Sequence, residues 1–166
     1  MSEPALRAAA LEALLVEKGL ISTDAIDAVV ARYEQELGPQ HGARVVARAW
    51  TDADYRERLL ADGTAAVQEL GIQGTELNTL VAVENAPGVH NLVVCTLCSC
   101  YPWPLLGLPP KWYKESAYRA RAVAEPHAVL REFGVELPAG ADVRVWDSTS
   151  DVRYLVVPER PGGSER

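Results

Sequence analysis

The chain has 166 residues with 48% hydrophobic content, which suffices for one domain with its own core but not for two ordinary domains with linkers. Its formal net charge of −7 and pI near 5.0 disfavour nucleic acid and acidic membrane surfaces as partners, because both would repel the chain. No apolar run approaches the ~20 residues that cross a bilayer, and residues 1–19 are too charged for a signal peptide, so we expect a cytoplasmic protein.

The N-terminal part of the chain carries apolar residues at helical spacing. Leu6, Leu11, Leu14 and Leu15 predict a helix over residues 4–18. Four more helices are predicted in succession: from Ser22 or Thr23 to near Gly38, from about Gly42 through Trp50, from Asp52 to about Leu60, and over 64–70. We expect residues 1–70 to form a helical N-terminal arm.

The pattern changes at Gly71 to one that mixes strands and helices. The predicted strands cover 79–84, 89–94, 142–147 and 152–157, and the predicted helices cover 111–123 and 126–133. The segment 101–110 is too rich in proline for regular structure. We expect an α+β fold in one structural unit overall, with the helical arm followed by a layered α/β/β/α body, residues 71–166, that carries a CxxCxC metal loop.

All three cysteines of the chain, Cys95, Cys98 and Cys100, lie within six residues directly after a predicted strand. A disulfide-stabilised secreted fold would distribute an even number of cysteines along the chain. Thiolates are soft ligands that favour transition metals over magnesium or calcium. The cluster therefore favours a metal site.

Other readings of the cluster stay open at this point. A structural zinc site needs a fourth ligand, and His90, separated from the cluster by a predicted strand, is a poor candidate. Iron–sulfur clusters usually take four cysteines, and a redox-active CxxC pair would be perturbed by the third cysteine nearby. Three inert buried cysteines would be a coincidence at this density.

The spacing of the cluster also brings backbone groups close to any bound metal. The amide nitrogens of Ser99 and Cys100 lie beside the flanking sulfurs, and a trivalent ion could displace both amide protons. Three sulfurs and two nitrogens from one loop would leave one coordination position open, as a catalytic metal requires.

The motif CTLCSC, residues 95–100, resembles the metal-binding motif of the nitrile hydratase and thiocyanate hydrolase family, and of cobalt-type nitrile hydratase alpha subunits in particular. Similar segments, among them YPWPLLGLPPKWYK and YRARAVAEPHAVLREFGVELP, extend over nearly the whole chain. The resemblance implies that the sulfurs of Cys95, Cys98 and Cys100 and the amide nitrogens of Ser99 and Cys100 bind a non-corrin metal. Thr96 is the residue typical of cobalt enzymes, so the resemblance favours Co(III), with Fe(III) as the alternative.

The resemblance further implies an oxidised cluster and an assembly. Cys98 would become a sulfinate and Cys100 a sulfenate, while Cys95 would remain a thiolate. Arginines of a beta-type partner subunit, which some family members divide into two chains, would stabilise those oxygens. A cobalt-insertion accessory protein would load the metal. A small-molecule nitrile would be hydrated to its amide, with attack by the Cys100 sulfenate oxygen or by an activated water.

Three further residues match positions that support the site in the family, and a fourth position departs from the family's pattern. Trp103 is expected to shape the pocket, and Asp147 and Arg153 to orient the cluster loop or the subunit interface. Glu76 stands where many relatives have glutamine, which would change the charge of the pocket.

Two alternatives to nitrile hydratase remain at the level of sequence. A thiocyanate hydrolase subunit would use the same cluster on another small substrate. A non-catalytic thiolate module for metal binding or redox sensing would need unoxidised cysteines, and the long match after the cluster argues against it.

Overall fold

The computed structural model describes residues 2–35, 38–74, 77 and 79–162. The chain divides into two compact units, residues 1–36 and 37–166. The first unit contains α1 (Glu3–Glu17) and α2 (Thr23–Gln35), joined through Gly19, whose positive φ of 68° a glycine adopts without strain.

The helices of the first unit expose their apolar residues. No residue of α1 is buried. The exposed apolar side chains of this unit are Leu6, Leu11, Leu14, Leu20, Ile21, Val29 and Val30. Such a unit gains little stability from its own packing, because the free energy of burial scales with the apolar area removed from water.

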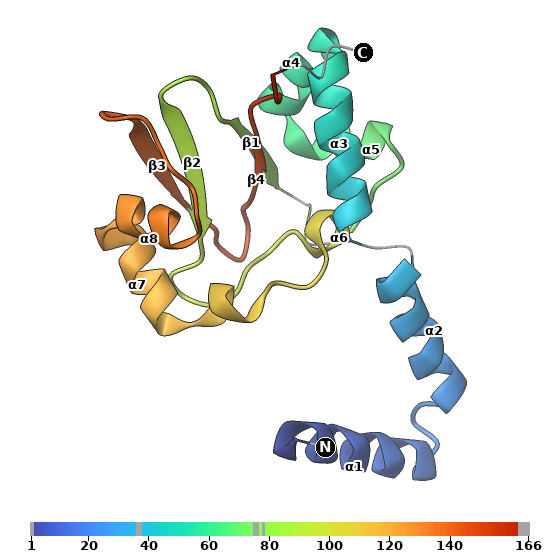
Figure 1. Ribbon diagram of the computed structural model, residues 1–166. Coiled ribbons are helices and arrows are strands. Elements are labelled where there is room, and N and C mark those ends of the chain that lie inside the picture. Colours follow the sequence, from blue (N-terminus) through green and yellow to red (C-terminus); the bar gives the residue numbers. More distant parts are fainter. Residues whose placement is uncertain (1, 36–37, 75–76, 78, 163–166) are drawn as a thin grey trace. The chain divides into compact units, whose positions relative to one another are not determined.

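The second unit contains eleven named elements among the described residues, seen along the chain in Figure 1. Three helices come first: α3 (Pro39–Thr51), α4 (Ala53–Ala61) and α5 (Gly63–Glu69). The strands are β1 (Leu80–Glu84), β2 (Val89–Val94), β3 (Asp142–Asp147) and β4 (Arg153–Val157). Between β2 and β3 lie α6 (Trp103–Leu106), the 3₁₀ helix η2 (Lys111–Lys114), α7 (Ser116–Ala124) and α8 (Pro126–Glu132).

The four strands form two parallel pairs rather than a hairpin of neighbours. β1 pairs with β4, with Leu80 opposite Arg153, and β2 pairs with β3, with Val94 opposite Asp147. Parallel neighbours need a long crossover, and the segment with α6, η2, α7 and α8 supplies it between β2 and β3. The pairing puts the ends of β2 and β3 side by side, where the cysteine loop begins.

Each strand pair shares a core with its own group of helices, and Figure 1 shows these helices beside the strands. Side chains of α3, α4 and α5 pack with β1 and β4, and the fully buried members include Val45, Leu59, Val67 and Val157. A second core joins β2 to α7 and α8, and it includes Val94, Cys95, Tyr118, Val129 and Leu130. Helices on strand pairs on both sides give the expected α/β/β/α body.

The division that we expected at residue 70 stays a prediction, and the contacts within the chain divide it at residues 36–37. Helices α3–α5 precede residue 70 in the chain, yet they share a core with β1 and β4 and belong to the second unit. The physical reason is that amphipathic helices pack wherever their apolar face is covered, and the pattern of one helix does not say by what.

Two local expectations were wrong. The proline-rich segment contains the short helix α6, in which Leu105 is fully buried against the core of α3. A Cβ on Gly42 of α3 would lie 2.8 Å from the Leu105 carbonyl oxygen, so glycine permits this close approach. The single helix predicted over 111–123 is divided, because Glu115 is extended between η2 and α7.

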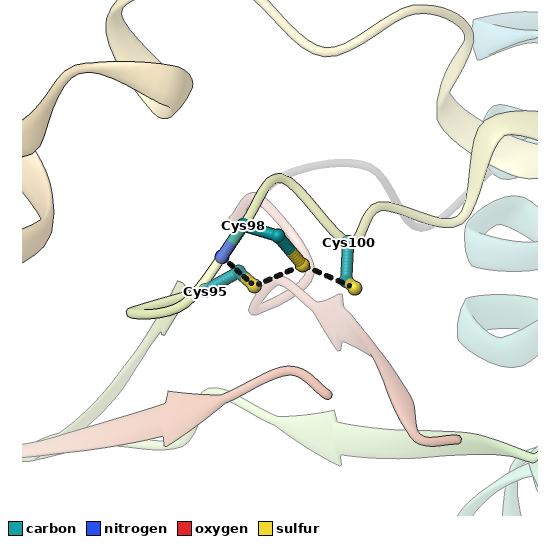
Figure 2. Close-up of side chains that lie close together, drawn as sticks. All are labelled: Cys95, Cys98 and Cys100. Atoms are coloured by element: carbon teal, nitrogen blue, oxygen red, sulfur yellow. Dashed lines mark hydrogen bonds between the residues drawn. The ribbon is translucent and has the colours of Figure 1, made fainter. Parts of the chain in front are cut away.

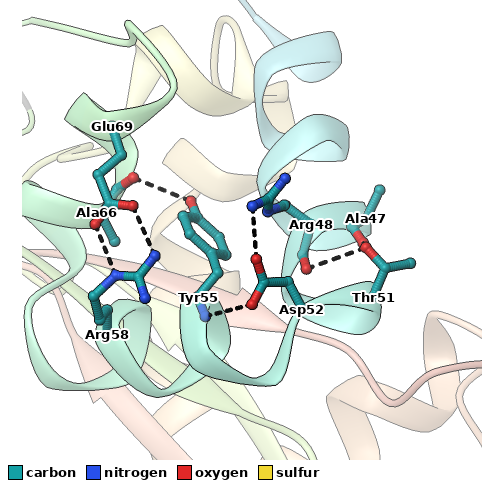
Figure 3. A network of polar contacts seen from close by, with 8 residues as sticks. All are labelled: Ala47, Arg48, Thr51, Asp52, Tyr55, Arg58, Ala66 and Glu69. Carbon is teal, nitrogen blue, oxygen red and sulfur yellow. Dashed lines mark hydrogen bonds and ion pairs between the residues drawn. The ribbon is translucent and has the colours of Figure 1, made fainter.

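A closed polar network stabilises the packing of α3, α4 and α5 (Figure 3). Asp52 caps α4 by accepting from the Tyr55 amide at 2.9 Å and pairs with Arg48 at 2.6 Å. Arg58 binds Glu69 through two hydrogen bonds of 3.0 and 2.9 Å. The buried Tyr55 ring lies between both guanidinium groups, each 5.9 Å from its centroid, and its hydroxyl donates to the Ala66 carbonyl.

Candidate metal centre

The cysteine loop starts at the buried end of β2. Val94 and Cys95 are both fully buried in the core that β2 shares with α7 and α8. The Ser148 amide donates to the Val94 carbonyl at 2.7 Å, which continues the pairing of β2 with the β3 strand one step further. The first cysteine is therefore held rigidly, while the residues after it turn outward.

The three sulfurs meet at one point of this loop (Figure 2). Cys95 Sγ lies 3.3 Å from Cys98 Sγ, and Cys98 Sγ lies 2.9 Å from Cys100 Sγ. All three sulfurs lie within 4.8 Å of one another. Cys95 is buried, Cys100 is half-buried and Cys98 is exposed, so the cluster opens to the surface on one side.

The thiols of Cys98 and Cys100 differ in pKa because of their surroundings. Hydrogen bonds from Cys100 and then Cys95, together with nearby backbone amides, lower the pKa of Cys98 to about 7. Burial, and then the hydrogen bond with Cys98, raise the pKa of Cys100 to about 12. Of these two thiols, Cys98 is the one that loses its proton more readily, and a thiolate is a nucleophile and a metal donor.

Backbone amides of the loop also face the sulfurs. The amides of Cys100 and Ser99 lie close enough to the Cys98 sulfur to help lower its pKa. The Cys98 amide donates to Cys95 Sγ at 3.3 Å. The two nitrogens that the sequence singled out therefore lie at the cluster.

The carboxylate of Asp147 holds the beginning of the loop. Its two oxygens accept from the Thr96 amide at 2.9 Å and from the Thr96 hydroxyl at 2.6 Å. Asp147 ends β3, opposite Val94 at the end of β2, so the parallel register delivers this side chain to the loop. Asp147 and Thr96, 51 residues apart, were both singled out by the sequence.

Two residues that the sequence analysis did not single out hold the remainder of the loop. The Tyr113 hydroxyl donates to the Cys100 carbonyl at 3.0 Å, and Arg119 Nη1 donates to the Cys98 carbonyl at 3.3 Å. Burial raises the pKa of Tyr113 far above its ordinary value, so its hydroxyl stays protonated and remains a donor. No sequence signal marked either residue, because the contacts depend on how η2 and α7 pack against the loop.

The other predicted site residues are placed as follows. Arg153 Nη1 donates to the carbonyls of Thr149 and Val152, and the guanidinium is close enough to Cys100 to oppose the rise of the pKa of this thiol. Trp103 is half-buried at the start of α6, where its amide donates to the Tyr101 carbonyl. Glu76 lies outside the described residues.

The residues present fit a transition metal. Three soft sulfur donors converge within one short loop, and two backbone amides lie among them. The exposed Cys98 leaves one side of the cluster accessible to a small molecule. Within the described residues, no helix is long and apolar enough to cross a membrane.

The chain matches the family model described as nitrile hydratase, alpha chain, over residues 2–166. It is 56% identical to the alpha subunit of a low-molecular weight cobalt-containing nitrile hydratase from Rhodococcus rhodochrous, over 98% of this chain and 79% of the relative. It is 52% identical to the alpha subunit of a cobalt-containing nitrile hydratase from Pseudonocardia thermophila, over 96% and 78% of the two chains. The gamma subunit of thiocyanate hydrolase from Thiobacillus thioparus is 40% identical, over 94% and 68%.

Solved structures also share the fold. A double mutant of the Fe-type nitrile hydratase from Comamonas testosteroni matches with a TM-score of 0.91 and 40% identity, over 99% of this chain and 82% of that chain. A recombinant thiocyanate hydrolase with partially modified cobalt centres matches with a TM-score of 0.84 and 39% identity, over 99% and 81%.

Proposed function

The chain belongs to the family of nitrile hydratase alpha chains, and from this premise we propose that it is the metal-bearing subunit of a cobalt enzyme that hydrates a nitrile to the amide. The observation that carries the proposal is the convergence of three cysteine sulfurs within 4.8 Å on one loop with an accessible side. A non-catalytic thiolate module is disfavoured, because the similarity to the enzymes extends over nearly the whole chain.

The proposed ligands are the sulfurs of Cys95, Cys98 and Cys100 and the amide nitrogens of Ser99 and Cys100. The three sulfurs lie close together, and the two amide nitrogens face the Cys98 sulfur. This convergence supports the set, because the ligands of one metal must point toward one position. Co(III) is preferred over Fe(III), since relatives named as cobalt enzymes are 52–56% identical and the Fe-type structure is 40% identical. Thr96, typical of cobalt members, agrees with this choice.

When bound, the trivalent metal would supply a Lewis acid that polarises the nitrile without changing its own redox state. The chain's own residues would supply the oxygen chemistry. We assign the sulfinate to Cys98 and the sulfenate to Cys100, with Cys95 kept as a thiolate. Exposure supports this order, because oxidation of cysteine follows thiolate character and access: Cys98 is exposed with a lowered pKa, and Cys95 is buried.

Cys100 is the proposed nucleophile or the residue that activates one. Its sulfenate oxygen would attack the nitrile carbon directly, with a water then releasing the product and restoring the sulfenate, or it would accept a proton from a water that attacks. By either route one water is consumed, and its two protons end on the nitrile nitrogen as the amide forms. Trp103, three residues further along the chain, would limit the space beside the cluster. Asp147 and Arg153 would hold the loop and the groups next to Cys100 in orientation.

As an alpha-type subunit, the chain works with a beta-type partner. The exposed middle of the loop supports a partner at this face, since Leu97 is 86% exposed beside the exposed Cys98. We propose that arginines of this partner, whether it is one chain or two, stabilise the oxidised cysteines, and that an accessory protein inserts the cobalt. The chain itself brings the ligands and the partner completes the pocket.

A thiocyanate hydrolase remains the second candidate. Its support is the 40% identity and the shared fold, against 52–56% for nitrile hydratase relatives. Assays of the purified complex with small nitriles and with thiocyanate would separate the two. Turnover of thiocyanate without turnover of nitriles would overturn the first proposal.

The direct test is native mass spectrometry of the chain co-expressed with its partner in cobalt-fed cells. We expect a complex with cobalt and with the mass of one sulfinate and one sulfenate added to the chain. A folded complex that carries zinc or no metal, with unmodified cysteines and no nitrile turnover, would overturn the enzyme assignment.

A further inference from the structure

Arg119 reaches the cysteine loop from the helix α7. Its Nη1 donates to the Cys98 carbonyl at 3.3 Å, across 21 residues of sequence. The same side chain lines a shallow pocket with Thr96 at the beginning of the loop. Arg119 thus lies beside both Thr96 and Cys98 of the loop.

Arg119 forms no ion pair with a carboxylate of the described residues. Among the ion pairs of the described residues, none involves Arg119, and its Nε is buried without a hydrogen-bond partner. Its neighbour on α7, Arg121, is bound by Glu125 and by both oxygens of Glu132. A guanidinium keeps its charge at all relevant pH values, so Arg119 offers the loop an unneutralised cation.

The carbonyl that Arg119 contacts belongs to a particular peptide group. The Cys98 carbonyl and the Ser99 nitrogen are the two ends of one planar, conjugated unit. When the nitrogen of such a unit exchanges its proton for a metal and the proton leaves to solvent, the negative charge spreads over nitrogen and oxygen. A cationic donor at that oxygen forms a stronger hydrogen bond to the charged form than to the neutral one.

We propose that Arg119 is a positioning residue for metal loading, which orients the Cys98–Ser99 peptide with its nitrogen toward the sulfurs and offsets the charge that this peptide gains. The inference rests on the proposed ligand set, in which the Ser99 nitrogen binds the metal. It adds to that set a residue of this chain that acts on the peptide group behind the Ser99 nitrogen.

Tyr113 provides an internal comparison. Its hydroxyl also donates to a carbonyl of the loop, at 3.0 Å, but that carbonyl belongs to the Cys100–Tyr101 peptide, whose nitrogen is not a proposed ligand. The donor is neutral. If the loop carbonyls need only to be held in place, removal of either hydrogen bond should reduce metal retention to a similar extent. If charge at the Ser99 peptide matters, removal of Arg119 should reduce metal retention more than removal of the Tyr113 hydroxyl.

The test uses the full chain co-expressed with its partner in cobalt-fed cells. The variants are Arg119→Met, which keeps the apolar stem, Arg119→Gln, which keeps a neutral donor, and Arg119→Lys, which keeps the charge. Arg121→Gln on the same helix controls for the loss of an arginine, and Tyr113→Phe for the loss of a loop hydrogen bond. Cobalt per chain, resistance of bound cobalt to a chelator, the sulfur-to-cobalt absorption band and the unfolding temperature are measured for each.

We expect Arg119→Met and Arg119→Gln to retain cobalt about 10- to 100-fold less well, the range found when a group behind a metal ligand is removed. Arg119→Lys should recover most of the loss, Tyr113→Phe should lose less, and Arg121→Gln should load normally. The band of any cobalt that remains should shift in the Met and Gln variants, which a purely structural change in unfolding temperature would not produce.

Three outcomes would overturn the inference. The first is that Arg119→Met retains cobalt as well as the unmodified chain. The second is that Arg119→Gln retains cobalt fully while Arg119→Lys does not. The third is equal losses in Arg119→Met and Tyr113→Phe. Should Arg119→Gln fail to fold, the Met and Lys pair still decides between charge and packing. An unmodified chain that takes up no cobalt would instead contradict the proposed function itself.

Discussion

The network around Tyr55 and the contacts around the cysteine loop both consist of arginines and backbone groups. They differ in whether the arginine nitrogens have partners within the chain. Around Tyr55 both Arg48 and Arg58 have carboxylate partners within the chain (Figure 3). Around the loop, the buried Nε atoms of Arg119 and Arg153 have no hydrogen-bond partner. A closed network holds helices together, whereas an open one keeps donors for groups that the chain does not itself contain.

The difference extends to exposure. Tyr55 is 1% exposed, and its ring is enclosed by α3, α4 and α5. Cys98, in contrast, is exposed to solvent, and its sulfur lies close to the other two sulfurs. We therefore expect changes at Tyr55 to act on stability, and changes at the loop to act on metal and turnover.

The largest effect is expected for Cys100→Ser, which should abolish nitrile hydration and weaken cobalt retention. A serine hydroxyl is a poor ligand for a soft site, and it cannot form a sulfenate. The unfolding temperature of the metal-free chain should change little, since this thiol is only half-buried. Turnover and cobalt content of the co-expressed complex are the measurements, and a fully active variant would contradict the mechanism.

A large effect of the other kind is expected for Tyr55→Ala, which should lower the free energy of unfolding by about 3 to 5 kcal/mol, as for other large aromatic residues cut back in a core. Tyr55→Phe loses only the hydrogen bond to the Ala66 carbonyl and should cost about 1 kcal/mol. Denaturant unfolding measures both. If the Phe variant lost cobalt while it stayed folded, the separation of the two regions would fail.

An intermediate effect on the metal is expected for Asp147→Ala, because both hydrogen bonds that hold Thr96 are lost. Cobalt retention should fall about 10- to 100-fold, as for other supports of metal ligands. Thr96→Val removes the hydroxyl contact alone and should fall less. Competition with a chelator measures the loss, and an order of effects in which Thr96→Val exceeds Asp147→Ala would be unexpected.

The smallest effect is expected in acid. The hydrogen bond from the Tyr55 amide, and then the Arg48 guanidinium, hold the pKa of Asp52 below its ordinary value of 3.8. The stabilisation by this carboxylate is therefore complete above that value and is lost as the pH falls through the lower pKa of the folded state. As the pH is lowered below about 4, the unfolding temperature of Asp52→Asn should fall less steeply than that of the unmodified chain. Thermal unfolding measured at a series of pH values checks this.

Much of the local structure could be predicted from the sequence. Strands 89–94 and 142–147 occur with the expected bounds, and the other two begin one residue later than expected. The helix that we expected to begin at Asp52 begins one residue later, because Asp52 is itself the cap and accepts from the Tyr55 amide. These features follow from side-chain periodicity and local hydrogen bonding, which nearby residues decide.

The cysteine cluster was also determined by sequence alone, because three sulfurs within six residues can meet through the geometry of one loop. Only the tertiary structure decided what holds that loop. The parallel pairing of β2 with β3 brings Asp147 to Thr96, and the packing of α7 brings Arg119 to the Cys98 carbonyl. Spacing along the chain fixes which groups can share a loop, but contacts over 21 and 51 residues depend on how separate elements pack, and no local pattern encodes that.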